Sequence, residues 1–340
     1  MEQALYGPEG FYRGSSRPAD HFRTSVHASS LFTTAIACLI DEVDRLLDHP
    51  DQLDVVDLGA GGAELLTGLL ACMPEHISSR ARMTAVELLP RPAGLDTRIQ
   101  WRREPPNDIV GVIIGNEWLD NVSLTIVQRT AQGVAEVLVD ETTGAEALGA
   151  SPSDVDRRWL ESWWPLDHAH VGDRAEVGTT RDIAWQGAVS CLQRGLALGI
   201  DYCHDLASRK QGVYAAGTIA GFRHGRWVTP LPDGTCDITA HVALDACAAQ
   251  AGVNGIDSSL LTTQRQALIS LGVSGARPSI ELASTEPAAY IKALREASEA
   301  GELLDAAGLG AFGWLIQTRD IGLPPSLSAL SADGVPQQSL

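Results

Sequence analysis

The segment that decides the fold is Leu53–Leu58 (LDVVDL), followed by the glycine turn 59–62 (GAGG) and a leucine-rich stretch at 64–73 (ELLTGLLACM). The first part is a short apolar run rich in valine, which is typical of a buried strand. The last part repeats leucine at the spacing of an amphipathic helix. Residues 82–87 (RMTAVE) are typical of a second strand. This order predicts a β-α-β unit with parallel strands and a right-handed crossover.

Further strands and helices are predicted along the chain. Residues 109–115 (IVGVIIG) and 196–200 are apolar without alternation, as expected of parallel strands covered on both faces, and 312–318 is predicted to be the last strand. The segments 124–128 and 134–139 flank Gly133 and predict an antiparallel hairpin within an insertion. The remaining predictions are a linker passing into a helix at 152–160, helices at 241–251, 263–271 and 287–300, a long loop or lid at 212–237, and a disordered tail from 323.

The composition excludes several functions. The chain has 340 residues, and its 43 acidic against 25 basic residues give a net charge of −18, which opposes binding to nucleic acid and to anionic membrane surfaces. No apolar stretch approaches the ~20 residues of a membrane span. The six cysteines form no C-x-x-C pair, and the N-terminus lacks the basic start and apolar run of a signal peptide. We therefore expect a cytoplasmic protein with reduced thiols and no metal site.

Acidic side chains follow the predicted strands at their carboxyl ends: Asp57, Glu87, Glu117 or Asp120, and Asp201. Ligands of open parallel sheets bind beyond these ends. Glycines in the turn 59–62 can bring main-chain N–H groups close to a ligand, because they leave no Cβ in the way. A plain tight turn that joins strand to helix is the alternative.

The charges around the turn favour one class of cofactor. A dinucleotide fingerprint requires Gly or Ala at position 64, where this chain has Glu64, and this anion and Asp57 would repel a pyrophosphate. S-adenosylmethionine has no phosphate and presents an ammonium and a sulfonium group, which the acids attract. Glu87 lies where a carboxylate accepts hydrogen bonds from ribose hydroxyls in either class. Trp101 is interpreted either as a neighbour of an adenine ring or as a structural residue.

A series of motifs resembles the MidA family (DUF185) of class I S-adenosylmethionine-dependent methyltransferases, which includes the mitochondrial complex I assembly arginine methyltransferase. The segment 116–120 (NEWLD) is similar to the family's N-E-F-F-D signature. The order of the motifs along the chain makes the resemblance specific. The other matches are 10–12 (GFY), 21–25 (HFRTS) with Phe32, 57–61 (DLGAG), 86–87 (VE), 200–202 (IDY), 217–218 (GT), 222–224 (FRH), 237–242 (DITAHV), Gln264, Gly310 and Phe312.

The resemblance implies a Rossmann-like α/β sheet, mostly parallel with an antiparallel last strand. It also implies an N-terminal cover segment at 1–50, a methyltransferase core at 51–320 with insertions around 121–180 and 204–240 that shape a substrate cleft, and a tail at 321–340. S-adenosylmethionine is the implied cofactor, and protein arginine is the acceptor in at least one branch. The cofactor-binding residues carried over by position are Thr24 and Ser25 in the cover, Asp57, Gly59, Gly61, Glu87 and Asn116.

The chain departs from the family pattern at four places. The glycine turn G-P-G-R-G becomes 59–63 (GAGGA), T-S-P-E-I becomes 24–28 (TSVHA), D-A-L-P becomes 120–123 (DNVS), and I-D-Y-G becomes 200–203 (IDYC). These departures leave the identity of the acceptor open.

Methyl transfer is an in-line displacement that needs alignment of the nucleophile and removal of a proton, without a metal. Glu117, Asp120 and Asp201 are the predicted catalytic residues, because carboxylates can hold an arginine guanidinium bidentately. Glu117 is favoured because it follows its strand directly. Asp120 could instead cap a helix, as 237–239 (DIT) is interpreted to do, and His241 or His224 could act as a base.

The leading hypothesis is an S-adenosylmethionine-dependent methyltransferase that acts on protein arginine. One alternative is a small-molecule N- or O-methyltransferase. The other is an assembly or scaffolding protein that keeps the fold but has lost methyl transfer. The expected partner is a protein or small-molecule substrate, with no nucleic acid and no membrane, and the sequence leaves the oligomeric state open, a homodimer included.

Overall fold

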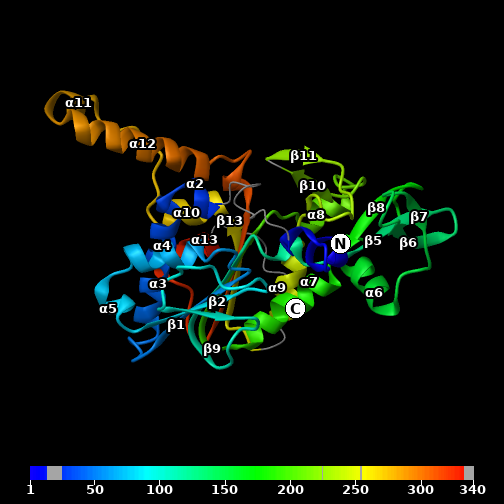
Figure 1. The fold of residues 1–340 in the computed structure, drawn as a ribbon, viewed down its shortest axis with the longest axis horizontal. Coiled ribbons are helices and arrows are strands. Elements are labelled where there is room, and N and C mark those ends of the chain that lie inside the picture. Colours follow the sequence, from blue (N-terminus) through cyan, green and yellow to red (C-terminus); the bar gives the residue numbers. More distant parts are fainter. Residues whose placement is uncertain (14–24, 224, 253–254, 333–340) are drawn as a thin grey trace. The chain divides into compact units, whose positions relative to one another are not determined.

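The computed structural model describes residues 1–13, 25–223, 225–252 and 255–332 (Figure 1). These residues form two compact units. The hairpin unit contains the described residues of Met1–Phe22, Glu117–Ser190 and Asp201–Gly255. The core unit contains those of Arg23–Asn116, Cys191–Ile200 and Ile256–Leu340. No helix within the described ranges has both the length and the apolar character needed to cross a bilayer.

The core unit is built on a seven-stranded sheet with the strand order β13-β14-β9-β4-β1-β2-β3. The pairs β9–β4, β4–β1, β1–β2 and β2–β3 are parallel, and β13 and β14 are antiparallel. The predicted fold class, a mostly parallel sheet with an antiparallel last strand, is therefore confirmed. The strands are β1 (Leu53–Leu58), β2 (Ala81–Val86), β3 (Ile99–Arg102), β4 (Ile109–Asn116), β9 (Leu192–Asp201), β13 (Ser258–Thr263) and β14 (Gly313–Arg319).

Two glycines set how closely the central strands approach. Gly111 on β4 and Gly195 on β9 lie opposite each other, with φ of 148° and 129°. A Cβ atom on Gly195 would lie 1.9 Å from the carbonyl oxygen of Gly111. Only glycine fits at this contact, because any side chain there would collide with the neighbouring backbone.

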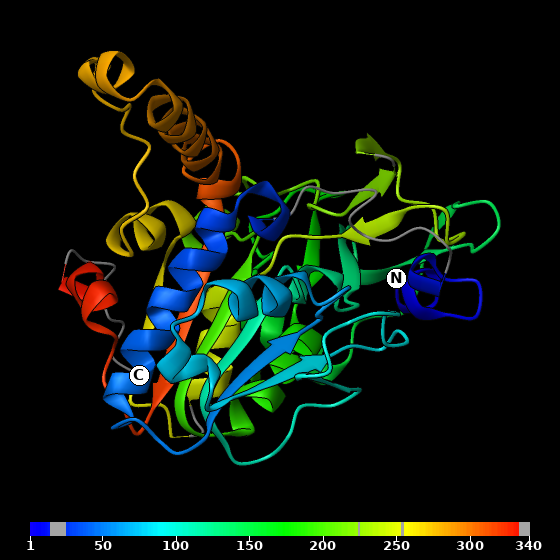
Figure 2. The same ribbon diagram turned by 60° about the vertical axis from the view of Figure 1, so that its left-hand side comes forward.

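Helices of the core unit pack around this sheet (Figure 2). The longest of those against the sheet, α3, begins after the N-cap Ser29, whose Oγ accepts a hydrogen bond from Leu31 N at 3.0 Å, and it buries Phe32, Ile36 and Ile40. The helices are α2 (Ser25–Ala28), α3 (Ser30–Leu46), α4 (Glu64–Cys72), α5 (Glu75–Ser78), α10 (Gln264–Ser270), α11 (Ile280–Thr285), α12 (Pro287–Leu303), the 3-10 turn η4 (Leu309–Ala311) and α13 (Pro325–Ala332).

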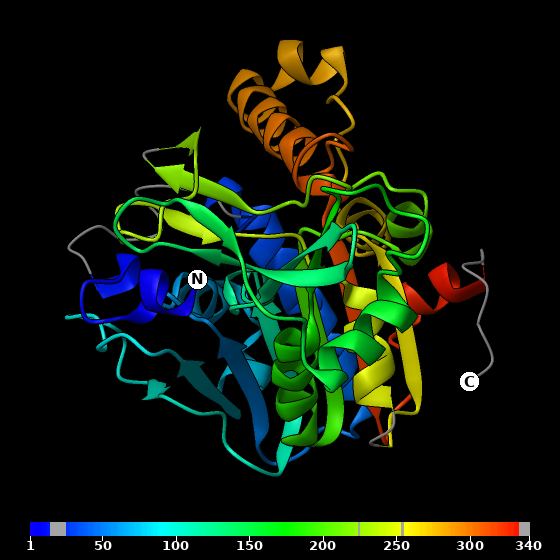
Figure 3. The same ribbon diagram turned by 90° about the vertical axis from the view of Figure 1, so that its right-hand side faces the viewer.

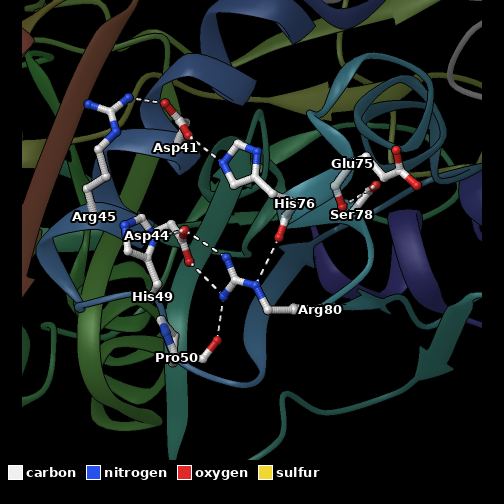
Figure 4. Close-up of polar contacts among 9 residues, drawn as sticks. All are labelled: Asp41, Asp44, Arg45, His49, Pro50, Glu75, His76, Ser78 and Arg80. Carbon is white, nitrogen blue, oxygen red and sulfur yellow. Dashed lines mark hydrogen bonds and ion pairs between the residues drawn. The ribbon is translucent and has the colours of Figure 1, made fainter.

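A polar network ties the end of α3 to the start of β2 (Figure 4). The buried carboxylate of Asp44 accepts hydrogen bonds from Arg80 at 3.1 and 2.9 Å and contacts His49 Nδ1 at 2.6 Å. Burial opposes ionisation of Asp44, but the hydrogen bonds from Arg80 and His49 outweigh it and lower the pKa of this carboxyl. The neighbouring Asp41 contacts His76 Nε2 at 3.2 Å.

The hairpin unit consists of two small antiparallel sheets and short helices (Figure 3). One sheet has the order β7-β6-β5-β8 and the other β11-β10-β12. The strands are β5 (Thr125–Thr130), β6 (Gly133–Val139), β7 (Glu146–Leu148), β8 (Arg174–Val177), β10 (Ala220–Arg223), β11 (Arg226–Val228) and β12 (Asp237–Thr239). The helices are α1 (Glu2–Tyr6), η1 (Phe11–Arg13), η3 (Leu119–Asn121), α6 (Asp154–Trp163), α7 (Thr179–Ser190), α8 (Leu206–Lys210) and α9 (Leu244–Gly252).

Most predicted elements are present, with bounds shifted by a few residues. The strand–turn–helix–strand unit is β1, α4 and β2, and the predicted hairpin around Gly133 is β5 and β6. The expected loop at 212–237 is wrong in part, because it contains β10 and β11. Helix α13 lies within the stretch for which disorder was predicted, and 333–340 lie outside the described residues. The sequence analysis did not predict α3 or β13.

The N-terminal segment does not stay in one unit. Residues Met1–Arg13 belong to the hairpin unit, where Leu5 and Phe11 pack with Ile238 of β12, whereas α2 and α3 belong to the core unit.

Candidate functional site

The glycine turn of the core unit is held to the adjacent strand. The N–H groups of Gly59 and Ala60 both donate to the carbonyl oxygen of Val86, at 3.0 and 3.2 Å. Gly59 and Gly61 have φ of 65° and 56°, in the left-handed region that favours glycine. The left-handed backbone explains why these positions are glycine and keeps main-chain N–H groups at the end of β1.

Glu87 joins this turn to the end of β2. Its Oε2 accepts a hydrogen bond from Gly61 N at 3.0 Å, and its Oε1 accepts from Leu88 N at 2.6 Å and Leu89 N at 3.0 Å. A carboxylate offers about four acceptor positions, so the three main-chain donors leave Glu87 able to accept a further hydrogen bond. The half-buried carboxylate is fixed in place and keeps capacity for a hydroxyl donor.

Three acids meet at this end of the sheet. Asp57 is 4% exposed, and burial raises the pKa of its carboxyl, with Glu64 and Glu87 nearby raising it further. Glu64 also accepts a hydrogen bond from Gly62 N at 2.9 Å. Repulsion from Glu64 and Glu87 adds to the effect of burial on the pKa of Asp57, so a cation bound beside these acids would be stabilised and a pyrophosphate would not.

The other predicted cofactor residues lie in different surroundings. Asn116 is the last residue of β4. Ser25 is fully buried, and its hydroxyl donates to Gln264 Oε1 at 3.3 Å. Thr24 lies outside the described residues. Trp101 is part of β3, and its indole N–H donates to Leu89 O at 2.9 Å.

Two of the predicted catalytic acids, Glu117 and Asp201, are the first residues of the segments Glu117–Ser190 and Asp201–Gly255 of the hairpin unit. Glu117 directly follows Asn116 in the chain, is half-buried, and has a left-handed backbone with φ of 52°. Such a conformation is uncommon for a residue with a side chain and is concentrated at functional sites. Asp201 is 1% exposed, and its Oδ2 accepts hydrogen bonds from Leu119 N at 2.9 Å and Asp120 N at 3.1 Å. Asp201 thus fixes the turn that follows Glu117.

Asp120 lies inside η3 and does not cap a helix. It is 5% exposed, and its Oδ2 accepts a hydrogen bond from the hydroxyl of Thr239 at 2.7 Å. Its Oδ1 is buried and accepts no hydrogen bond from any residue that the structure describes. The interpretation of 237–239 as a cap is also wrong, because these residues form β12 and pair with β10.

A buried cation, Arg181, lies among these acids. The Arg181 guanidinium is 1% exposed and donates to the carbonyl oxygens of Asp120 at 2.5 Å, His241 at 2.8 Å, and Val122 and Ala240 at 3.0 Å. Burial raises the pKa of the Asp120 carboxyl, and the charge of Arg181 opposes this shift. Burial also raises the pKa of Asp201, and the nearby Asp120 and Glu117 add to that shift.

A further buried acid extends this cluster. Tyr12 Oη lies 2.9 Å from Asn121 Oδ1 and 3.1 Å from Asp237 Oδ1, and Asn121 Nδ2 donates to the same Asp237 oxygen at 3.1 Å. Burial and the charge of Asp120 raise the pKa of Asp237 to about 7. The sequence analysis quoted Tyr12 and Asp237 in motifs but gave neither a role at the site, and it gave no signal for Arg181.

His241 is held rigidly beside these residues. Its main-chain N–H donates to Thr218 Oγ1 at 2.8 Å, and its ring stacks on Tyr202 with a centroid distance of 5.9 Å. Burial and the charge of Arg181 lower the pKa of the imidazole, so it is neutral at pH 7. His224, the other predicted base, lies outside the described residues.

A family model matches residues 35–262, which is more than half of the chain, and its description is "Putative S-adenosyl-L-methionine-dependent methyltransferase". No curated protein matches the chain.

Two solved structures are similar over nearly the whole length. One is a COG1565 superfamily member from Burkholderia thailandensis bound to S-adenosyl-homocysteine, with 25% identity, a TM-score of 0.77, and coverage of 96% of this chain and 89% of that one. The other is a native structure of a COG1565 superfamily protein from the same organism, with 25% identity, a TM-score of 0.75, and coverage of 96% and 88%. The chain therefore belongs to this family of S-adenosylmethionine-dependent methyltransferases, and S-adenosylmethionine is its cofactor.

Proposed function

We propose that the chain transfers the methyl group of S-adenosylmethionine to the guanidinium of a protein arginine. The observation that carries this proposal is the cluster of Glu117, Asp120, Asp201 and Asp237 in the hairpin unit, which contains the single buried cation Arg181 among its described neighbours. A cluster richer in carboxyl groups than in cations favours a cationic acceptor over a neutral or anionic one.

The core unit would hold the cofactor. S-adenosylmethionine supplies a methyl group activated by a sulfonium. Gly59 and Gly61 would line its methionine part, and Glu87 would accept hydrogen bonds from the ribose hydroxyls with the lone pairs that its main-chain partners leave. The positive end of the ligand would relieve the repulsion that raises the pKa of Asp57. Ser25, enclosed by its hydrogen bonds with Gln264, would support the cover without touching the cofactor.

The acids of the hairpin unit would have two roles, one in positioning the turn and one in binding the acceptor. Asp201 and Asp120 are almost fully buried and hydrogen-bonded to neighbouring groups, so they would position the turn. Glu117 is the member with partial exposure, and its carboxylate would accept two N–H bonds from the planar guanidinium. This fork fixes the direction of the attacking nitrogen, which is what an in-line displacement requires.

A small-molecule acceptor with an amine or hydroxyl nucleophile is the second candidate. It is favoured by His241, whose neutral ring has a buried Nδ1 with no hydrogen-bond partner among the described residues. A neutral imidazole could accept the proton that such a nucleophile releases.

The test is to incubate a lysate that lacks the protein with methyl-labelled S-adenosylmethionine and purified protein, and to identify the labelled species. We expect label on arginine in a protein fraction, and loss of this label with Glu117→Gln but not with the exposed control Glu161→Gln. Label confined to small molecules would favour the second candidate. Cofactor binding without labelling of any species would contradict both and favour a scaffolding protein.

A further inference from the structure

His204 of the hairpin unit is held by a buried arginine. The five N–H groups of the Arg209 guanidinium donate to Trp163 O at 2.7 Å, to His204 Nδ1 at 2.9 Å and His204 O at 2.8 Å, and to the two carboxylate oxygens of Asp245 at 2.8 and 2.7 Å. Burial and the charge of Arg209 lower the pKa of His204 to about 3, so the imidazole is neutral. Because a guanidinium only donates, His204 Nδ1 is an acceptor and the ring proton is on Nε2.

This N–H group of His204 is buried without an acceptor. His204 is 5% exposed, and its Nε2 has no hydrogen-bond partner among the residues that the structure describes. The ring lies edge-on to Trp164 at a centroid distance of 4.9 Å and 5.0 Å from the ring of Tyr214. Burial of an unpaired N–H group is costly, so the group indicates a partner that the described side chains do not supply.

A second unpaired ring nitrogen lies close to the first. His241 Nδ1 is buried and has no partner in the described part of the chain, and the centroids of the two imidazoles are 6.2 Å apart. The main chain fixes this arrangement, because His204 N donates to Val242 O at 3.3 Å and Val242 N donates to Tyr202 O at 2.8 Å. The two ring nitrogens form no direct hydrogen bond, but rings at this separation are within reach of one bridging water.

The direction of these hydrogen bonds determines where His241 carries its proton. A water between the rings accepts from His204 Nε2–H and donates to His241 Nδ1. If the water accepted from both rings, both of its own O–H groups would need acceptors within an aromatic cluster. We propose that this chain of hydrogen bonds, the histidine relay of Asp245, Arg209, His204 and the water, keeps the proton of His241 on Nε2, where it donates to a carbonyl oxygen of the methyl acceptor.

This inference rests on the proposed function and separates its two candidates. An imidazole with its proton on Nε2 cannot take a second proton at that atom from a nucleophile, so His241 is not the base of a small-molecule methyltransferase. The ring of His241 is partly exposed and stacks on Tyr202. Burial, and then the charge of Glu117, raise the pKa of Tyr202, which places Tyr202 near the proposed guanidinium site. A main-chain carbonyl beside the acceptor arginine therefore suits the Nε2–H donor of His241.

Nitrogen-15 NMR of the full chain with labelled histidine tests the histidine relay without any acceptor. Couplings to the carbon-bound ring protons show which nitrogen carries the proton, and His241→Gln assigns the signals. We expect the Nε2–H form alone for His241 at pH 8, and a mixture of both forms in His204→Phe, which keeps an aromatic ring but has no donor. The matched control His168→Phe, at an exposed histidine of the same unit, should leave the His241 signals unchanged.

Two NMR results would overturn the proposal. One is a wild-type His241 with its proton on Nδ1, which needs no folded His204 variant to be seen. The other is an unchanged His241 tautomer in His204→Phe that circular dichroism shows to be folded.

Methyl transfer to the arginine peptide from the lysate experiment distinguishes a donor from a base. His241→Leu should raise the KM for this peptide about fivefold with little change in kcat, and His241→Gln, whose amide can still donate, should restore most of the loss. An equally large fall in kcat for both variants would identify His241 as a base and overturn the proposal. Absence of label on any arginine would contradict the proposed function, while the tautomer measurement would still decide the histidine relay.

Discussion

Replacing Tyr12 by Phe removes one hydroxyl from the buried acid cluster and should destabilise the protein more at high pH than at low pH. The hydroxyl lies 3.1 Å from Asp237 Oδ1 and 2.9 Å from Asn121 Oδ1. Asp237 is 3% exposed, and burial and the charge of Asp120 raise its pKa from 3.8 to about 7. The ionised carboxylate is therefore the form that depends most on its hydrogen-bond donors.

The sign follows from the raised pKa. The unfolded chain releases the proton near pH 4, whereas folded Asp237 holds it until about pH 7, so folding stability falls between these values. The full difference between the two pKa values of Asp237 corresponds to about 4 kcal/mol in the free energy of unfolding. Below this window Tyr12 provides a neutral hydrogen bond of about 1 kcal/mol, and above it a charge-assisted one of about 2 kcal/mol. Tyr12→Phe should thus raise the pKa of Asp237 further.

Urea unfolding at pH 5.5 and pH 8.5, followed by circular dichroism, measures this difference. We expect the loss in free energy of unfolding to be about 1 kcal/mol larger at pH 8.5. Tyr6→Phe is the matched control, since Tyr6 stacks on Tyr12 and its hydroxyl donates to Asn121 O at 3.4 Å. An equal loss at both pH values for Tyr12→Phe would refute the assignment of Tyr12 as a donor to ionised Asp237.

Three other changes test separate parts of the account. Glu87→Gln should weaken S-adenosylmethionine binding about tenfold by calorimetry, because the neutral amide is a weaker acceptor; unchanged affinity would remove Glu87 from the cofactor site. Glu117→Gln should lower the rate of methyl transfer about 100-fold in single-turnover assays while cofactor affinity stays the same, and a parallel loss of affinity would count against its role toward the acceptor. Arg181→Met should cost about 3–5 kcal/mol in denaturant unfolding, because it leaves buried carboxyls uncompensated; a loss under 1 kcal/mol would show that Arg181 does not stabilise the acids.

Local sequence was sufficient to predict the strand–turn–helix unit and the acids around it. β1 is buried at every position, with four apolar residues among its six, and its turn requires left-handed residues, so both leave a clear pattern in the sequence. The grouping of Asp57, Glu64 and Glu87 was predicted for the same reason, because the ends of adjacent parallel strands meet.

Contacts between residues far apart in the sequence could not be predicted in this way. Arg181 lies in a helix with no motif, and its role depends on carbonyl groups from 120–122 and 240–241. Residues 237–239 have the composition of a helix cap, but pairing with β10 makes them a strand. The carboxylate of Asp120 likewise accepts a hydrogen bond from Thr239, more than 100 residues away, and does not cap the helical turn in which Asp120 lies.

Methylation of paired peptides tests the central claim most directly. The arginine peptide identified in the lysate experiment would be compared with the same peptide carrying citrulline, which keeps the shape of the side chain but removes its charge. We expect the purified protein to place label on the arginine peptide and none on the citrulline peptide. Equal labelling of the two peptides would contradict recognition of a cationic acceptor by the acids around Glu117.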